Sequence, residues 1–437
     1  MEIRVGLTTN DLTKLFHDGV TVSSPGGLSV SPTRAAEHSH KVAPEVQVRI
    51  TSKGGALHLA GVEGVTPGTN QSIFIHANGT SQLVVNSLKR AHGAKSPEPH
   101  YVGSLEIKPT GGQLRIILIT TLENYIKGVL QSEIPASYEL EAVKAQAVAA
   151  RTYALRPRID HGIDLCNVCD SYLCCQYFAG VETISARHTQ AIADTSGQIL
   201  TYNGKPILAL FSSNAGGCTE DYQNCFSDPN TNEFPPPALP YLQSVSEKDF
   251  ALNTKSLSEA DLRKIWSQQH AYPSADAWSP HFFWHVTMPA SALEAHMHHE
   301  ISVLQKDPMM TPFIVPPTSE QFGHINNLKV LKRGKSGTAI ELAVETSTGT
   351  WVIKKELVIR SIFKNSELSL ARLKSAKLFF DFKRDSNGLL TQIVASGLGW
   401  GHGVGMQQTG AQGWAKREKN YKEILGHYFP GSEISDV

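Results

Sequence analysis

The pattern of hydrophobic and polar residues predicts β-structure at both ends of the chain and helices between them. Residues 1–120 contain short apolar or alternating runs separated by glycine, proline and asparagine, which is typical of strands joined by turns. The longest apolar run covers residues 114–122 and is interrupted by Arg115, so it predicts a buried strand. The β pattern returns near the C-terminal end, where the run 376–382 is expected to pair with 390–395.

The middle of the chain carries the helical signals. Apolar residues recur at spacings of three and four over residues 138–156, and many are alanine, which favours a closely packed helix. Ser137 is expected to cap the N-terminus of this helix. A second helix is expected over residues 181–195, and Asn203 and Gly204 then suit the type I′ turn of a hairpin.

Residues 226–330 are the least regular part, with proline-rich loops and two short helices expected over residues 257–269 and 291–304. The whole pattern predicts an α+β fold in which β-rich N-terminal and C-terminal parts surround a helical segment. The length of 437 residues allows roughly two to four domains, and we expect one large elaborated domain.

Composition and charge exclude several classes of protein. Forty Lys+Arg residues balance forty Asp+Glu residues, so the chain lacks the bulk positive charge that non-specific nucleic-acid binding uses. No apolar stretch reaches the ~18 residues of a membrane span. The first residues show neither the basic nor the apolar region of a signal peptide, so we expect either a cytoplasmic protein or a targeting segment outside this chain.

The six cysteines are unevenly placed. Cys166, Cys169, Cys174 and Cys175 lie within ten residues, and His161 is nearby in the sequence. Four soft ligands at this spacing suit a closed structural zinc site, whereas one or two disulfides are the alternative in an oxidising compartment.

Glycine occupies every second position from Gly397 to Gly405. A strand of this composition would be weak, so we expect a loop whose backbone approaches another group closely. The spacing does not match a dinucleotide-binding glycine motif. Within this loop, His402 is either a functional residue or a polar residue satisfied inside a structural loop.

Glu133 is the carboxylate that we single out for chemistry. Its neighbours are apolar, among them Val129, Leu130 and Ile134. Apolar surroundings raise the pKa of a carboxyl group and let it serve as a general acid. The alternative is a surface glutamate just before the N-terminus of the following helix, whose dipole would favour the ionised form.

Several blocks of the sequence resemble the sporulation stage II D / LytB-type domain. The first, residues 122–153, contains a Glu-Ile-Pro motif at Glu133. The others are the cysteine cluster, residues 211–220 and the glycine-rich block 399–411. The resemblance extends over residues 100–430.

This resemblance implies a peptidoglycan lytic transglycosylase that cleaves between N-acetylmuramic acid and N-acetylglucosamine, preferably on strands freed of stem peptides. Glu133 would protonate the glycosidic oxygen and then take the proton of the muramoyl 6-hydroxyl, giving a 1,6-anhydro product. This chemistry needs one carboxyl group, unlike the usual two-carboxylate glycosidase. The rival functions are a hydrolytic muramidase and a non-catalytic module that binds glycan or modifies an amidase.

The resemblance also implies a domain organisation and a set of binding residues. Residues 1–100 would form a β-rich N-terminal part, and residues 101–437 a catalytic domain with a substrate groove and an irregular helical insertion at 226–330. The matching helix residues would either line the groove or tie the helix to neighbouring loops, and the glycine-rich block would form the groove floor. The residues implied to bind substrate are Lys144, Gln146, Arg151, Asn214, Gly216, Gly217, His402 and Gln407.

For the cysteine cluster, the resemblance implies a structural zinc ion that the chemistry itself does not require. Cys169 and Cys175 keep the family's spacing, Cys174 stands in place of a histidine, and the remaining ligand is either His161 or Cys166. The implied partners are peptidoglycan glycan strands and an N-acetylmuramoyl-L-alanine amidase, with no nucleic acid. The implied location is the cell envelope, outside the cytoplasm.

Overall fold

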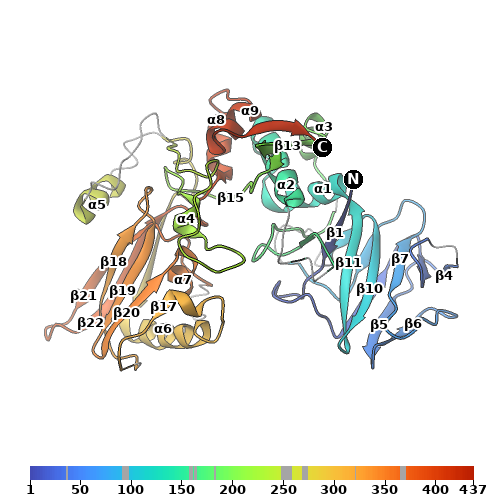
Figure 1. The fold of residues 1–437 in the computed structure, drawn as a ribbon, viewed down its shortest axis with the longest axis horizontal. Coiled ribbons are helices and arrows are strands. Elements are labelled where there is room, and N and C mark those ends of the chain that lie inside the picture. Colours follow the sequence, from blue (N-terminus) through green and yellow to red (C-terminus); the bar gives the residue numbers. More distant parts are fainter. Residues whose placement is uncertain are drawn as a thin grey trace. The chain divides into compact units, whose positions relative to one another are not determined.

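The computed structural model describes residues 1–35, 38–90, 98–156, 161, 165–181, 184–247, 258–267, 274–319, 321–364 and 371–437. They fold into two compact units (Figure 1). Unit 1 comprises Met1–Leu200 with Ser435–Val437, and unit 2 comprises Thr201–Ile434. The boundary at residue 100 that we expected from the sequence lies within unit 1. Parts of the predicted helices at 181–195 and 257–269 lie outside the described residues.

Unit 1 is built on two antiparallel-rich sheets whose apolar faces share one core. Val5, Ile75, Leu105 and Leu118 are completely buried in it. The seven-stranded sheet has the order β12 (Val168–Cys169), β1 (Glu2–Gly6), β11 (Gln113–Thr121), β10 (Ser104–Thr110), β7 (Ile73–Ala77), β3 (Leu28–Ser31) and β4 (His40–Val42). The five-stranded sheet has the order β6 (Ala56–Ala60), β5 (Val48–Lys53), β2 (Gly19–Ser23), β8 (Leu83–Val85) and β9 (His100–Tyr101).

Three helices complete the described part of unit 1. They are α1 (Leu122–Glu133), α2 (Leu140–Leu155) and α3 (Ala186–Asp194). The sequence did not predict α1. This helix follows β11 directly, and the Thr121 side chain caps its N-terminus by accepting a hydrogen bond from the Asn124 N–H. The predicted cap of α2 was wrong: the cap position is Glu139, not Ser137. Most of α2 is buried, which explains why its alanines lie on every face.

Unit 2 contains sheets of two, three and four strands with helices around them. The four-stranded sheet has the order β17 (Ile314–Val315), β20 (Gly349–Lys354), β19 (Ala339–Thr346) and β18 (Ile325–Arg333). The three-stranded sheet has the order β16 (Phe283–Pro289), β22 (Leu390–Leu398) and β21 (Leu378–Arg384), and β15 (Phe211–Ser212) pairs in parallel with β23 (Met406–Gln407). The described helices are α4 (Tyr222–Cys225), α5 (Glu259–Ser267), α6 (Ala290–Leu304), α7 (Glu356–Ser361), α8 (Gln408–Ala415) and α9 (Tyr421–Tyr428), with the short 3-10 turn η4 (Thr311–Phe313).

Several local predictions for unit 2 are confirmed. The predicted partners β21 and β22 pair in antiparallel register. The turn between β13 (Gln198–Tyr202) and β14 (Lys205–Pro206) has positive φ at both Asn203 (+51°) and Gly204 (+72°), as a type I′ turn requires. The part expected to be irregular contributes β16 to the three-stranded sheet and α6 to the core beside it.

The fold class is therefore α+β, as predicted. Helices and sheets occur in both units, and the last element, β24 (Glu433–Asp436), ends the chain near the unit boundary. Within the described residues, no helix combines the length and the apolar character that crossing a membrane would require.

Candidate functional site

Glu133 is the last residue of α1 and is half-buried. Our expectation that it stands just before the N-terminus of the next helix was incomplete, because α2 begins only at Leu140. The carboxyl group instead lies at the C-terminal end of α1, where the helix dipole disfavours a negative charge. Opposing this, the backbone N–H of Tyr177 donates a hydrogen bond to Glu133 Oε1 at 2.6 Å.

The last turn of α1 is fixed from two sides. On one side, the Ala179 N–H donates to Ser132 Oγ at 3.1 Å, so residues 177–179 run along the helix end. On the other side, His188 Nε2 lies 3.0 Å from the carbonyl oxygen of the buried Ile134. These contacts limit the positions that the Glu133 side chain can adopt.

Just before Tyr177 in the chain, the cysteine cluster converges on one histidine. Cys174 Sγ and Cys175 Sγ each lie 3.3 Å from His161 Nε2. Together with Cys169, their ligand atoms all lie within 4.8 Å of one another. The choice between His161 and Cys166 is thereby decided for His161, because Cys166 packs in a separate apolar cluster on the sheet.

The donor set fits a zinc ion. Three thiols and one imidazole within this distance match a tetrahedral site, in which Zn–S bonds are about 2.3 Å long. Hydrogen bonding with Cys174 and Cys175, together with burial, raises the pKa of the Cys169 thiol. A divalent cation would displace the thiol protons and relieve this crowding. We refer to His161, Cys169, Cys174 and Cys175 as the cysteine knot.

A buried ion pair that the sequence analysis missed supports the same loop. Asp170 and Arg90 pair with both side chains fully enclosed. The Thr8 N–H donates to Asp170 Oδ1 at 2.9 Å, and the Phe178 N–H donates to the Asp170 carbonyl at 3.1 Å. No sequence signal joins Arg90 to Asp170, which are 80 residues apart. The pair anchors Asp170 between two residues of the cysteine knot, Cys169 and Cys174, and the Asp170 carbonyl also holds Phe178, the residue after Tyr177.

Two of the helix residues implied to bind substrate form ion pairs with other residues of unit 1. Arg151 is fully buried and donates to both Glu123 carboxylate oxygens, at 2.8 and 2.9 Å. Lys144 Nζ lies 2.9 Å from Glu141 and 3.0 Å from Asp194. These contacts connect α2 to α1 and α3, which favours the alternative that such residues tie the helix to its neighbours.

Gln146 is the exception among these helix residues. Its side chain is fully buried, and neither amide atom has a hydrogen-bond partner among the described residues. Buried amides are normally satisfied by protein or by ordered water. Gln146 is therefore not placed to contact a ligand at the surface of unit 1.

In unit 2, the glycine-rich loop packs against the chain itself. Gly399, Gly401, Gly403 and Gly405 have φ of +82°, +110°, +70° and +73°. A Cβ at Gly405 would lie 2.2 Å from the Leu210 carbonyl oxygen, so no larger residue fits. The predicted close approach of the backbone is confirmed, and its partner is the segment around residues 210–216.

The polar residues of this region hold the loop in place. Gln407 Oε1 accepts a hydrogen bond from the Ala215 N–H at 2.6 Å, and both residues are buried. Asn214 Nδ2 donates to Thr409 Oγ1 at 2.8 Å. Asn214 Oδ1 accepts from the Gly216 N–H at 2.7 Å, and Asp276 Oδ2 accepts from the Gly217 N–H at 2.7 Å.

His402 is half-buried in the same loop. Its Nδ1 accepts a hydrogen bond from the Val404 N–H at 3.0 Å, and its ring meets Phe226 edge-on at 5.2 Å between centroids. Burial lowers the pKa of His402 to about 4, so the imidazole is neutral at physiological pH. Its contacts match the structural alternative that the sequence left open.

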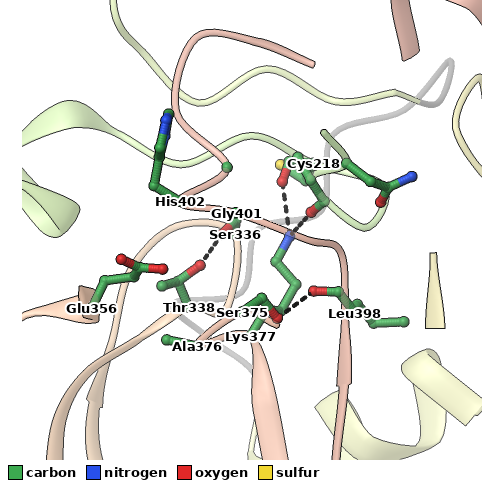
Figure 2. A pocket seen from close by; sticks show the side chains of 13 residues that line it. Cys218, Ser336, Thr338, Glu356, Ser375, Ala376, Lys377, Leu398, Gly401 and His402 are labelled. Carbon is green, nitrogen blue, oxygen red and sulfur yellow. Dashed lines mark hydrogen bonds between the residues drawn. The ribbon is translucent and has the colours of Figure 1, made fainter. Parts of the chain in front are cut away.

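A buried lysine that the sequence did not single out joins this network. Lys377 Nζ donates to the carbonyl oxygens of Ala215 at 2.6 Å and Cys218 at 2.8 Å, and burial lowers its pKa. Figure 2 shows its side chain beside a cavity of about 10 Å³, close to the space that one water molecule needs. The cavity is lined in part by Ser336, Thr338, Glu356, Lys377 and His402.

Comparison with known proteins connects these features to a family. Residues 110–202 match the family described as Stage II sporulation protein, and residues 229–405 match a domain of unknown function, DUF8618. The chain is 28% identical over 336 residues to an uncharacterized protein of Brachyspira hyodysenteriae, covering 77% of this chain and 72% of that protein. It is 27% identical over 330 residues to Stage II sporulation protein D of Bacillus subtilis, covering 72% of this chain and 75% of that protein.

A further relative is the amidase enhancer of Bacillus subtilis, which is 28% identical over 316 residues. That match covers 71% of this chain but only 40% of the amidase enhancer. The first family match contains Glu133, α2 and the whole cysteine knot. Through residues 110–202, the chain is similar to the Stage II sporulation protein family, and its relatives include a stage II sporulation protein D and an amidase enhancer.

Proposed function

We propose that this protein acts on the bacterial cell wall as a peptidoglycan lytic transglycosylase, with Glu133 as its general acid and base. The observation that carries the proposal is a half-buried carboxyl at the end of α1, fixed by the Tyr177 N–H within the segment that matches the family. A cell-wall substrate is supported by relatives that are named stage II sporulation protein D and amidase enhancer.

The proposed reaction uses one carboxyl group in two protonation states. Protonated Glu133 gives its proton to the glycosidic oxygen as the bond from C1 of N-acetylmuramic acid to that oxygen breaks. The resulting carboxylate then takes the proton of the muramoyl 6-hydroxyl while O6 bonds to C1. The products are a 1,6-anhydro end and a free N-acetylglucosamine end, and no water is consumed.

The surroundings of Glu133 suit a group that must be both acid and base. The C-terminal end of α1 favours the protonated form, whereas the Tyr177 N–H, at 2.6 Å, favours the carboxylate. These two effects therefore act in opposite directions on the carboxyl group. A general acid–base group must both give and take a proton during the reaction.

A zinc ion in the cysteine knot would serve structure rather than chemistry. His161, Cys169, Cys174 and Cys175 would hold it, and it would fix the loop that presents the Tyr177 N–H to Glu133. Zinc bound by four protein ligands keeps no open position for substrate.

Substrate and partner are part of the same proposal. Glycan strands freed of stem peptides are the preferred substrate, an N-acetylmuramoyl-L-alanine amidase would supply them, and the protein works in the cell envelope. In unit 2, the buried residues Asn214, Gly216, Gly217 and Gln407 serve glycan binding indirectly, by holding the glycine-rich loop.

The second candidate function is modification of an amidase without cleavage of glycan. The similarity to the amidase enhancer favours it. Against it stands the complete Glu-Ile-Pro motif with its hydrogen-bonded carboxyl.

The products of wild-type protein on peptide-free glycan strands separate these functions. We expect fragments whose muramoyl ends are lighter by one water than hydrolysis products, as measured by mass spectrometry. Fragments of full hydrolytic mass would indicate a muramidase. Intact strands, together with faster release of stem peptides from peptide-bearing peptidoglycan by an added amidase, would support the amidase modifier.

A further inference from the structure

Unit 2 carries two tryptophans that are unusually exposed for their size. Trp278 and Trp400 are 45% and 40% exposed, although tryptophan is usually well buried. Each has a lysine ammonium over its ring: Lys416 lies 5.0 Å from the ring centre of Trp278, and Lys374 lies 4.7 Å from that of Trp400. We call these four residues the tryptophan–lysine surface.

Trp400 is rigidly placed by its backbone. Its N–H donates to the Asn214 carbonyl at 2.7 Å, and its carbonyl accepts from the Asn214 N–H at 3.1 Å. The next residue, Gly401, donates its N–H to the Lys374 carbonyl at 2.9 Å, which keeps Lys374 beside the ring. Trp400 is therefore presented by the part of the glycine-rich loop that the buried polar residues hold in place.

Trp278 is fixed through its side chain. Its indole N–H donates to the Thr409 carbonyl at 3.1 Å. Thr409 is the residue whose hydroxyl group accepts from Asn214 Nδ2, so Asn214 supports both tryptophans. Fixed aromatic rings lose little conformational entropy when a ligand covers them.

The segment that carries Trp278 also reaches Trp400. His281, three residues after Trp278, meets the Trp400 ring edge-on with 4.5 Å between centroids. Three residues span at most about 11 Å, so the two tryptophans belong to one local surface. Two exposed aromatic rings on one local surface suit an extended ligand rather than a small molecule.

We propose that the tryptophan–lysine surface binds glycan strands whose muramoyl residues carry free lactyl carboxylates. The proposal rests on the proposed function for the choice of substrate. Apolar faces of pyranose rings pack on exposed aromatic rings, and a lysine ammonium beside each ring can pair with a carboxylate. Where a stem peptide is attached, the lactyl group is an uncharged amide. The surface thereby prefers strands from which the peptides have been removed.

A single-stranded nucleic acid is the rival ligand, since bases stack on aromatic rings and phosphates pair with lysine. Nucleic-acid binding normally draws on a broad excess of positive charge. The forty basic and forty acidic residues of this chain provide no such excess. Similarity to the Stage II sporulation protein family also favours glycan.

Binding is best measured in the full chain carrying Glu133→Gln, so that strands are not consumed. The probes are amidase-treated glycan strands, the same strands with carboxylates converted to methylamides, chitin oligosaccharides and a single-stranded DNA oligonucleotide. Isothermal titration gives the dissociation constant, and tryptophan fluorescence reports whether the rings are covered.

We expect Trp400→Ala and Trp278→Ala each to weaken binding of amidase-treated strands about tenfold or more, as for buried aromatic contacts at interfaces. Phenylalanine at either position should restore most of the affinity. Lys374→Gln with Lys416→Gln should remove the preference for carboxylate strands over methylamide strands. Lys383→Gln, an exposed lysine of β21, is the matched control and should change nothing.

Two outcomes would overturn the proposal: unchanged affinity in both alanine variants with unaltered folding, or DNA that competes with the strands at lower concentration. Cleavage is assayed separately with the Glu133 side chain present. Strands bound through the tryptophans but never cleaved would contradict the proposed function and leave this inference standing. If wild type cleaves the strands but binding does not depend on the tryptophans, the proposed function stands and this inference is contradicted.

Discussion

In unit 1 the carboxyl of the motif residue Glu133 is half-buried and accepts a backbone hydrogen bond, whereas in unit 2 the matching polar residues Asn214 and Gln407 are buried and bond within the protein. Glu133 receives a backbone hydrogen bond from the loop that follows the cysteine knot. Gln407 Oε1 and the Asn214 side chain, by contrast, bond to backbone groups and to Thr409 inside the protein.

The difference teaches that one kind of sequence signal can have two physical causes. Glu133 stands out because an acid lies among apolar residues at a helix end, where its carboxyl stays partly accessible. The glycine-rich loop stands out because positive φ and close backbone contact exclude side chains. The first signal belongs to the carboxyl that we propose as the acid, and the second belongs to a tightly packed backbone that presents other residues, such as Trp400.

The largest effect on the stability of the fold is expected at the cysteine knot. Cys175→Ser should lower the bound zinc at least about tenfold, unfold unit 1 at a lower temperature and slow cleavage, because the loop carrying Tyr177 loses its anchor. Elemental analysis and thermal melting measure the first two effects. Cys166→Ser is the matched control and should keep the metal. A wild type that folds fully with no metal would contradict the zinc site.

Glu247 allows a test of unit 2 through pH. Burial, then the nearby Asp276, raises the pKa of Glu247 from 4.5 to about 8. The folded state therefore holds a proton that the unfolded state releases between these values, so the free energy of unfolding falls as pH rises from about 4.5 to 8. Glu247→Gln should flatten this decline, a change of a few kcal/mol at most.

Urea unfolding of wild type and Glu247→Gln at pH 5 and pH 8 measures this effect. If the free energy of unfolding falls by the same amount between pH 5 and pH 8 in both proteins, Glu247 is not the group responsible. Cleavage at a temperature where both proteins are folded should be little changed, because Glu247 is fully enclosed in unit 2.

The glycine-rich loop should be intolerant of side chains. Gly405→Ala meets both the strain of φ +73° and a backbone oxygen 2.2 Å from the new Cβ, and should cost about 3 kcal/mol of unfolding free energy. Gly388→Ala has φ +81° with open space and should cost only about 1 kcal/mol. Equal losses in the two variants would show that close packing is not the reason for Gly405.

The smallest expected loss comes from a single hydrogen bond. Gln407→Ala leaves the buried Ala215 N–H without its acceptor, which should cost about 1–3 kcal/mol. Gln321→Ala, at an exposed glutamine of the same unit, should be neutral. A Gln407→Ala protein of normal stability but weakened glycan binding would show that Gln407 contacts sugar directly.

The sequence predicted the pairing of β21 with β22 and the Asn203-Gly204 hairpin, because alternation and turn residues are local signals. It missed α1, although Leu122, Ile126 and Leu130 are spaced as on one helical face. The apolar run of β11 continues into α1 without a glycine or proline between them, so no turn-forming residue marks the end of the strand and the start of the helix. A buried strand and a buried helix then share one apolar stretch.

The candidate site was predictable as a set of residues but not as a geometry. Spacing offered all four cysteines as ligands, and the family resemblance implied Cys169, Cys174 and Cys175 with either His161 or Cys166 as the fourth ligand. His161 was decided by tertiary packing, since Cys166 faces the sheet. Arg90 could not be anticipated, because its partner Asp170 is distant in sequence and isolated charges carry no pattern.

The most direct test of the account compares wild type with Glu133→Gln on peptide-free glycan strands, with 1,6-anhydro ends counted by mass spectrometry. We expect Glu133→Gln to lower the cleavage rate about 10³-fold, because the amide can neither give nor take the proton. The variant should keep the zinc content and melting temperature of wild type. A Glu133→Gln protein that releases anhydro ends as fast as wild type would contradict the assignment of Glu133 as the acid.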